Sequence, residues 1–281
     1  VFLEKFIKNA RHIEIQIFGF GEKKAVHFYE RDCSIQRRFQ KIIEESPAPK
    51  VGSDIINKMS ESAVNFASNQ KYEGAGTIEF IYDVDEKKFY FLEMNTRIQV
   101  EHPVTESITN SDLVEMQIKF ALGIDTNLTE QNKINRTGHA IECRLYAEDP
   151  SKNFLPSPGK ISKLKIPNTN LVNIRLDIGV DEGDEISFYY DPMIAKIIAK
   201  GSTRVESIKN MLQYLKEFEI EGINTNKSFL ISVLQNKNFE EANFNTKFIE
   251  NNLTLFIKKK GDILPTKKQD KTQIKQEYSD K

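Results

Sequence analysis

The stretch FLEMNTRIQVEHP, residues 91–103, decides the fold and the function of this chain. If its backbone is extended, alternate side chains share one face, because successive side chains of a strand point to opposite sides. The odd-numbered face then carries two acids, two amides and a guanidinium, on Glu93, Asn95, Arg97, Gln99 and Glu101. The other face is mostly apolar and predicts a core contact, through Leu92, Met94, Ile98 and Val100. An ordinary solvated strand would carry mainly Lys, Thr and Ser, so the pattern favours a functional face.

A β-hairpin is predicted at residues 76–95, and its second strand overlaps the start of this stretch. GTIEFIYDV and KFYFLEMN alternate strongly, and Asp85-Glu86-Lys87 lies between them. This hairpin would bring Glu79 close to Glu93. Crowded carboxylates repel unless a cation lies between them, and Mg²⁺ in phosphoryl-transfer sites takes such hard oxygen ligands. Glu79 and Glu93, with Asn95, therefore predict a magnesium–nucleotide site; the alternative is that Arg97 neutralises one of the carboxylates.

Two basic segments are further candidates. RRFQK places Arg37, Arg38 and Lys41 after a predicted strand, and ECRLYAEDP places Arg144 on the same face as Glu142. Alone, each segment is typical of a set of surface salt bridges. They become candidates for a site only beside the acidic residues.

The element pattern predicts the α+β class. Residues 1–30 are expected to be β, because Ile13, Ile15 and Ile17 alternate with polar residues. Capping boxes begin two of the expected helices, with Asp112 and Glu115 in one and Thr203 and Glu206 in the other. The helices are expected at 53–70, 112–122, 203–218 and 227–236. Short β runs follow residue 138, in HAIECRLYA, GKISKLKI, VNIRLDIGV and EISFYYDPMIAKIIAKG.

Composition narrows the function classes. The 281 residues carry a net charge of −1, so no global field favours a nucleic acid or a membrane as partner. No apolar run approaches the length of a membrane span. Cys33 and Cys143 lack a metal or redox motif and are expected to be reduced, partly buried thiols. The chain begins with Val1 inside a strand-like segment, which we interpret as the loss of an N-terminal portion.

Together, the motifs resemble the biotin carboxylase family of the ATP-grasp superfamily over about residues 1–250. The resemblance rests on ordered motifs, namely EKFI, RHIEIQ, ERDCSIQRR, KIIEESPAP, GAGTIEF, FLEMNTRIQVEHPVTE, GHAIECRLYAEDP, FLPSPG and YYDPMIAK. It implies the C-terminal half of an ATP-grasp domain, an antiparallel sheet with helices, followed by a β-rich biotin carboxylase C-terminal domain with helices. The expected limits are 1–123, 124–256 and a charged flexible tail at 257–281.

The resemblance also implies a reaction and residue roles. Biotin carboxylases use MgATP (Mg²⁺ or Mn²⁺) and bicarbonate, through carboxyphosphate, to carboxylate biotin on a carrier domain. By resemblance, the metal ligands are Glu79 and Glu93, with Asn95 nearby. The ATP-contacting positions are Glu4, Lys5, Ile7, His12, Gln36, Ile81 and Leu92. Bicarbonate would bind at Lys41, Arg97, Gln99 and the Val100 backbone, Glu101 would be the general base, and Arg144 would stabilise the biotin enolate.

Some features set this chain apart. Phe39 stands where many family members have His, so an aromatic contact replaces an imidazole one there. The glycine-rich lid and the biotin-bearing AMKM motif do not occur in the sequence. We therefore expect little turnover from this chain alone. The segments YYDPMIAK and INTNKSFL most resemble those of α-subunits of propionyl- or methylcrotonyl-CoA carboxylases.

The resemblance implies a biotin carrier domain and a carboxyltransferase subunit as partners, in a homodimer or larger assembly. The compartment would be a bacterial cytoplasm or a mitochondrial matrix. Two alternatives stay open. Another ATP-grasp ligase, joining a carboxylate to an amine, would share Glu79 and Glu93, but does not predict RIQVEHPVTE or Arg144. A non-catalytic docking or oligomerisation module is the second alternative.

Overall fold

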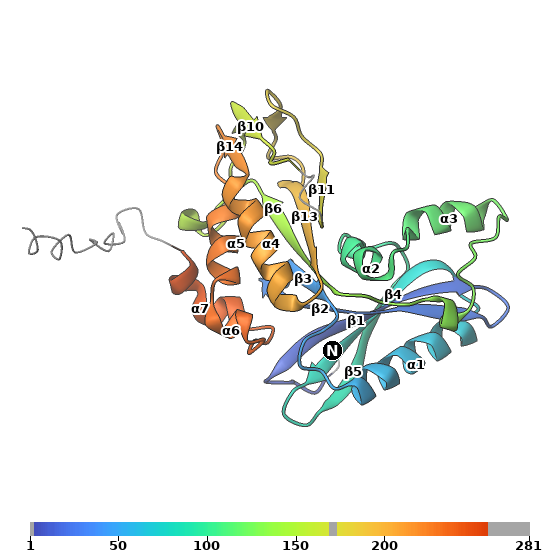
Figure 1. Cartoon of the computed structure of the whole chain (residues 1–281). Coiled ribbons are helices and arrows are strands. Elements are labelled where there is room, and N and C mark those ends of the chain that lie inside the picture. Colours follow the sequence, from blue (N-terminus) through green and yellow to red (C-terminus); the bar gives the residue numbers. More distant parts are fainter. Residues whose placement is uncertain (1–2, 169–172, 258–281) are drawn as a thin grey trace, which may run out of the picture.

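The computed structural model describes residues 3–168 and 173–257, and an antiparallel sheet forms its centre (Figure 1). Within the described residues this sheet has eight strands, in the order β11-β13-β6-β3-β2-β1-β4-β5. The strands are β1 (Ala10–Phe20), β2 (Ala25–Arg37), β3 (Gln40–Ser46), β4 (Glu73–Asp83), β5 (Lys88–Asn95), β6 (His139–Tyr146), β11 (Ile174–Ile178) and β13 (Met193–Gly201).

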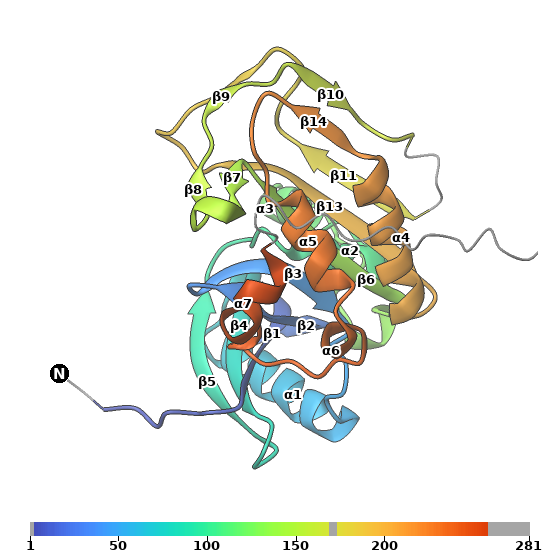
Figure 2. The same cartoon turned by 90° about the vertical axis from the view of Figure 1, so that its left-hand side faces the viewer.

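Helices and short strands complete the fold. The helices are α1 (Ser53–Asn69), α2 (His102–Thr109), α3 (Leu113–Ala121), α4 (Arg204–Glu217), α5 (Lys227–Leu234), α6 (Lys237–Glu240) and α7 (Phe248–Phe256). Two 3-10 turns lie at Gln131–Lys133 and Pro150–Lys152. The short strands pair as β7 (Glu148–Asp149) with β8 (Leu155–Pro156), β9 (Gly159–Lys160) with β12 (Glu185–Ile186), and β10 (Lys163–Lys165) with β14 (Glu219–Glu221). Strands β9, β10 and β14 lie at one end of the molecule and α1 lies at the other (Figure 2).

One face of the sheet packs on α1 and α4. Ile13, Ile15 and Ile17 of β1 form one apolar core with the buried stripe of α1. Farther along the sheet, Cys143 and Ile197 belong to a second core, to which α4, α5 and α7 contribute. Burial of these apolar side chains is the main favourable term in folding, and it fixes which side of each strand faces inward.

The opposite face is covered by α2, which lies over β2, β3, β6 and β13 (Figure 1). Val104 and Ile108 of α2 form a small core with Ala140 of β6 and Ile198 of β13. On β1 this face carries His12, Glu14 and Gln16, which are all buried. The expected half-buried strand is therefore buried on both faces, and polar side chains lie on the second one.

Most of the expected elements are confirmed. The hairpin is β4 and β5, and the helices expected at 53–70, 112–122, 203–218 and 227–236 are α1, α3, α4 and α5. The side chains of Asp112 and Thr203 accept hydrogen bonds from the backbone N–H of Glu115 and Glu206, as the capping boxes predict. After α3, Gly123 has a φ of +70°, which glycine adopts without strain.

Four expectations need correction. Residues 3–9 are not a strand, because β1 begins at Ala10; the side chains of Leu3 and Phe6 are exposed there. Residues 185–201 form two strands in different sheets, because an aromatic loop at 187–192 interrupts them. His102 and Pro103 lie at the end of the segment expected to be extended, but they begin α2. Helices α6 and α7 were not expected; α6 has only four residues, and α7 packs on the second core through Phe248, Ile249 and Phe256.

The predicted domain limits divide a continuous sheet. Strands β1 to β5 precede residue 123 and β6, β11 and β13 follow it, yet all belong to the same sheet. The tail expected at 257–281 lies outside the described residues, apart from Ile257. Both cysteines are free and fully buried, rather than partly buried as expected. In the described part of the chain, no helix combines the length and the apolar character needed to cross a membrane.

Candidate active site

A row of four charged residues crosses four neighbouring strands on the α2 side of the sheet. Glu93 of β5 is the register partner of Glu79 of β4, Glu79 is the partner of Glu14 of β1, and Glu14 is the partner of Arg31 of β2. Direct partners in an antiparallel sheet have side chains on the same face and close together. The register thus concentrates three carboxylates within one row, and cations must compensate them.

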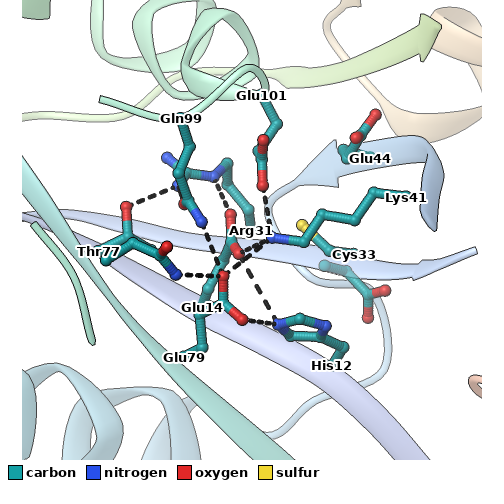
Figure 3. Close-up of polar contacts among 12 residues, drawn as sticks. His12, Glu14, Arg31, Cys33, Lys41, Glu44, Thr77, Glu79, Gln99 and Glu101 are labelled. Carbon is teal, nitrogen blue, oxygen red and sulfur yellow. Dashed lines mark hydrogen bonds and ion pairs between the residues drawn. The ribbon is translucent and has the colours of Figure 1, made fainter. Parts of the chain in front are cut away.

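Lys41 of β3 is the ammonium at the centre of this group (Figure 3). Its Nζ donates to Glu14 at 2.7 Å, to Glu79 at 3.1 Å and to Glu101 at 2.5 Å. Burial alone would raise the pKa of the Glu14 and Glu79 carboxyls. Lys41 outweighs burial, together with Arg31 at Glu14 and with His12 at Glu79, and lowers both pKa values to about 2. The same carboxylates raise the pKa of Lys41, although burial opposes them. Glu14, Glu79 and Lys41 are therefore charged at neutral pH.

Arg31 supports the group from below and was not among the predicted site residues. Its side chain is fully buried, and its Nε donates to Glu14 at 2.5 Å. The remaining N–H groups reach four neutral acceptors, on Gln16, Thr77, Gln99 and Thr105. A guanidinium with this many partners holds several side chains in fixed positions. The sequence offered a signal only for Glu14, the charged partner of Arg31: the alternation of HIEIQ places Glu14 on the same face as His12 and Gln16.

Glu101 lies between Lys41 and Arg144. Its Oε1 accepts from Lys41, and its Oε2 accepts from Arg144 Nη2 at 3.0 Å. Arg144 of β6 also pairs with Glu44 of β3, at 2.5 Å from Nη2 and 2.6 Å from Nε. Glu101 is only 2% exposed, so it is a buried carboxylate with two cationic partners. The predicted Lys41, Glu101 and Arg144 are thus brought together, and Glu44 is an addition.

The oxygen ligands expected for a metal also converge. Asn95 Nδ2 donates to Glu79 Oε1 at 3.0 Å and to Glu93 Oε1 at 3.2 Å, so the three side chains meet between β4 and β5. Carboxylate and amide oxygens are the donors that Mg²⁺ prefers, with water and phosphate oxygens completing its shell. The donor set therefore fits a magnesium ion. His12 is a further potential donor, since its Nε2 lies 2.8 Å from Glu79 Oε2.

The continuous extended backbone predicted for 91–103 is wrong. Strand β5 ends at Asn95, residues 96–100 are irregular with a bend at Arg97 and a turn at Val100, and Glu101 precedes α2. Pro103 occupies the first turn of α2, where its missing N–H costs nothing and its fixed φ favours the helix. Glu101 therefore reaches the charged row from the start of a helix that covers the sheet, not from a strand within it.

Arg97 and Gln99, predicted to share one face, separate in the structure. Gln99 is buried; its Nε2 donates to Glu79 at 2.7 Å, and its Oε1 accepts from Arg31 at 2.9 Å. Arg97 is exposed, and its Nη1 donates to the carbonyl of its neighbour Ile98. Among the described residues, Arg97 has no hydrogen bond or ion pair with Glu101. The Val100 carbonyl accepts from Lys196 Nζ at 3.0 Å, which the sequence did not predict.

The RRFQK segment divides at a tight turn. Arg38 and Phe39 link β2 to β3 and have positive φ values of 51° and 65°. Arg37 pairs with Glu148 at 2.8 Å, and Arg38 donates to Asn153 at 2.9 Å, so neither contacts the charged row. The Phe39 ring is 92% exposed. Lys41 alone of the three basic residues joins the row, because it follows the turn on the α2 face of β3.

The seven predicted ATP positions form two groups. His12 and Gln36 adjoin the charged row, with 2.7 Å between His12 Nδ1 and Gln36 Nε2. Lys5 is exposed near the tip of the β4–β5 hairpin, where its Nζ donates to Glu86 and Tyr90. Ile81 and Ile7 are half-buried, whereas Glu4 and Leu92 are exposed. Leu92 is the extra residue of a β-bulge, because Phe91 pairs with Phe80 and Glu93 pairs with Glu79.

This chain is similar to two family models and to several known proteins. Residues 1–129 match the family model for the ATP-binding domain of the carbamoyl-phosphate synthase L chain, and residues 142–251 match the model for the biotin carboxylase C-terminal domain. The chain is 50% identical over 250 residues to biotin carboxylase 1 of Bacillus subtilis, covering 89% of this chain and 55% of the relative. It is 47% identical over 247 residues to the mitochondrial methylcrotonoyl-CoA carboxylase subunit alpha of Mus musculus, covering 88% of this chain and 34% of the relative.

A solved structure shows the same similarity. The biotin carboxylase domain of the Hydrogenobacter thermophilus 2-oxoglutarate carboxylase, a dimer in complex with MgADP, ADP and bicarbonate, superposes with a TM-score of 0.86. Sequence identity is 39%, and the match covers 91% of this chain and 56% of that one. The chain therefore spans about half the length of this structure and of the bacterial relative.

Proposed function

Because the chain belongs to the biotin carboxylase family, we propose that it forms the bicarbonate- and metal-binding part of a biotin carboxylase, an ATP-dependent ligase. In this reaction, bicarbonate attacks the γ-phosphate of ATP, and the resulting carboxyphosphate supplies the CO₂ that joins the ureido nitrogen of biotin. The observation that supports the proposal is the buried Glu101 carboxylate, held by Lys41 and Arg144 beside the acidic row.

Glu101 is proposed as the general base. Bicarbonate is a weak nucleophile, so a base must accept its proton as it attacks phosphorus. Lys41 lies 2.5 Å from one oxygen of Glu101 and 3.1 Å from Glu79, so an anion bound there would be next to both an ammonium and a proton acceptor. Gln99 and the Val100 backbone are proposed to orient bicarbonate. Arg97, which is exposed here, would have to turn toward the anion to contact it.

Arg144 is proposed to stabilise the oxygen of the biotin enolate. Its guanidinium has donors left after pairing with Glu44 and Glu101, and charge-assisted hydrogen bonds to a developing oxyanion are among the strongest available. Glu44 keeps the Nε edge of Arg144 occupied. The free edge is then available to a ureido oxygen.

Glu79, Glu93 and Asn95 are proposed to hold Mg²⁺ or Mn²⁺ with the ATP phosphates, where the metal would neutralise charge on the phosphate oxygens. His12 and Gln36 are proposed to contact the nucleotide near this row, and Glu4, Lys5, Ile7, Ile81 and Leu92 to contact it along the hairpin. The exposed Phe39 ring is proposed to supply an apolar contact on the same side. Support comes from the convergence of the three oxygen-bearing side chains between β4 and β5.

The proposed partners follow from the relatives. A biotin carrier domain would deliver biotin, a carboxyltransferase would use the carboxylated carrier, and the chain would form homodimers, as the Hydrogenobacter domain does. We propose that the chain is part of an acyl-CoA carboxylase of the methylcrotonoyl-CoA type, because it is 47% identical to the alpha subunit of that enzyme from Mus musculus. The proposed compartment is a bacterial cytoplasm or the mitochondrial matrix, because one relative is bacterial and the other is named as mitochondrial.

The test is ADP release by the full-length protein with MgATP, with and without bicarbonate and free biotin. We expect ADP formation that requires bicarbonate and rises with biotin. If an amine substrate stimulates ADP formation and biotin does not, the protein is a different ATP-grasp ligase. If it self-associates but binds no MgATP, it is a non-catalytic module.

A further inference from the structure

Two glutamates beneath α2 have no partner for most of their oxygens. Glu44 of β3 and Glu142 of β6 are register partners, and both are completely buried. Oε1 of Glu44 accepts from Arg144, but its Oε2 and both oxygens of Glu142 have no hydrogen-bond partner within residues 3–168 and 173–257. Register partners on one face lie side by side, so the two acids share one buried pocket beneath α2.

Two ionised carboxylates cannot share this pocket at low cost. An unpaired buried charge is strongly unfavourable, and such a group takes up a proton instead. Burial raises the pKa of Glu142 well above its usual value, and the Glu44 charge raises it further. Burial also raises the pKa of Glu44, while Arg144 opposes that shift. One proton on Glu142 solves both problems, since it removes a charge and supplies a donor for Glu44 Oε2.

The groups around Glu142 explain why the proton belongs there. On its own strand, Arg144 uses its Nε on Glu44. On β13, Lys196 donates to the Val100 carbonyl and lies 3.2 Å from Asp177, so its charge is already engaged. From α2 come the apolar Val104 and Ile108, and Glu101 at the start of that helix adds a further negative charge. The surroundings of Glu142 are thus apolar or already paired.

We infer that Glu142 is a positioning residue: it carries a proton, donates it in a hydrogen bond to Glu44, and so fixes Arg144 beside Glu101. This inference rests on the proposed function for its catalytic consequence, but not for the protonation itself. Glu142 is the register partner of Glu44, and Glu44 accepts from Arg144, whose Nη2 lies 3.0 Å from Glu101. Glu142 touches neither the metal ligands nor the nucleotide positions.

Infrared difference spectroscopy tests the protonation directly, with no need for activity. At neutral pH, the wild type minus the Glu142→Gln variant should show the carbonyl stretch of a protonated carboxylic acid. The control is Glu45→Gln, because Glu45 is also buried on β3 but its pKa is lowered, so that difference should contain ionised carboxylate bands instead. Ionised bands for Glu142 would overturn the inference and indicate a bound water or cation in the pocket.

The positioning role is tested by kinetics of the full-length protein. Glu142→Leu leaves Glu44 Oε2 without a donor, so we expect kcat for bicarbonate-dependent ATP cleavage to fall about tenfold or more, with the KM for MgATP little changed. Glu142→Gln, which can donate to Glu44, should restore most of the lost rate. Circular dichroism and thermal unfolding check that both variants fold.

The outcomes separate this inference from the proposed function. If Glu142→Leu keeps the wild-type kcat while Glu101→Gln loses it, the positioning role is wrong and the base assignment stands. If Glu101→Gln also keeps the rate, the proposed function fails, and the infrared result still decides the protonation of Glu142. If Glu142→Gln is as slow as Glu142→Leu, the proton on Glu142 does not position Arg144.

Discussion

Lys41 and Glu101, 60 residues apart in the sequence, meet with 2.5 Å between Nζ and Oε1. The contact joins β3 to the start of α2, because the ammonium reaches up from the sheet to the helix that covers it (Figure 3). Lys41 also pairs with Glu14 and Glu79, so one ammonium compensates three carboxylates. The predictions below begin with this residue.

Replacing Lys41 with Met should destabilise the chain as well as inactivate it. Removing one partner of a buried ion pair leaves uncompensated charge, which costs about 3–5 kcal/mol. Urea unfolding at neutral pH measures the loss. Lys41→Arg keeps the charge and should retain most of the stability. A Lys41→Met variant as stable as the wild type would show that the three carboxylates find other partners.

Glu101→Gln should slow bicarbonate-dependent ATP cleavage by about a hundredfold or more in the full-length protein, because a general base contributes about 10²–10⁴-fold. Glutamine keeps the size of the side chain and a hydrogen-bond acceptor, so binding of MgADP should change little. ADP release and calorimetric titration measure the two quantities. The exposed Glu115→Gln on α3 is the matched control, and it should behave as wild type. An unchanged rate in Glu101→Gln would remove Glu101 from the base role.

Glu79→Gln and Glu93→Gln should each weaken magnesium-dependent nucleotide binding. Each variant would remove one anionic oxygen from the proposed metal site, where Asn95 contacts both carboxylates. Calorimetric titration of ADP with and without Mg²⁺ should show a smaller magnesium effect than in the wild type. Glu73→Gln, at the far end of the same strand β4, is the control. If both variants keep the full magnesium effect, the metal lies elsewhere.

Acid should destabilise the fold through Glu45. Burial would raise the pKa of this carboxyl, but Arg204 and His139 outweigh it and lower the pKa from 4.5 to about 2. Because the folded pKa is depressed, the stabilisation is full above the unfolded value and is lost as the pH falls from about 4.5 toward 2. The linked loss is up to about 3 kcal/mol. Urea unfolding at a series of pH values measures it, and Glu45→Gln should flatten that part of the curve.

The turn between β2 and β3 should be stabilised by a change that suits its backbone. Arg38 and Phe39 both have positive φ, which a two-residue hairpin turn normally gives to Asn and Gly. Replacing them with Asn-Gly should raise stability by about 1 kcal/mol, because Gly and Asn adopt the left-handed conformation at lower cost. Thermal unfolding measures the gain. If the exposed Phe39 ring contacts the nucleotide as proposed, the same variant should bind MgADP more weakly. Unchanged binding would remove Phe39 from the nucleotide site.

The local elements and many of the site residues could be predicted from the sequence because they depend on local pattern. Alternation fixed the hairpin and therefore the opposition of Glu79 and Glu93. The caps at Asp112 and Thr203 fixed two helix starts, since a side-chain oxygen there can satisfy a free backbone N–H. The ordered motifs identified the family, which the comparisons confirm. These features all lie within short stretches of chain.

Other features depended on which face of the sheet was covered. The alternation of β1 predicted one polar face but not that α2 would cover part of that side of the sheet, so Glu14 was missed as the shared partner of Lys41 and Arg31. The end of β5 at Asn95 was also missed, because the alternating residues that follow are equally compatible with a longer strand. In the structure they form the connection to α2, which begins at His102. Arg97 therefore lies in solvent, while Glu101 is buried.

The sequence by itself determined the hairpin, the capped helices, the family and the types of side chain that meet at the site. Only the tertiary structure decided which charges pair, because an ion pair depends on the distance between strands and helices far apart in the chain. It also decided that Glu44 and Glu142 lie side by side and fully buried. Burial beneath α2 changes the protonation of an acid, and no local pattern of residues reports how deeply a side chain will be covered.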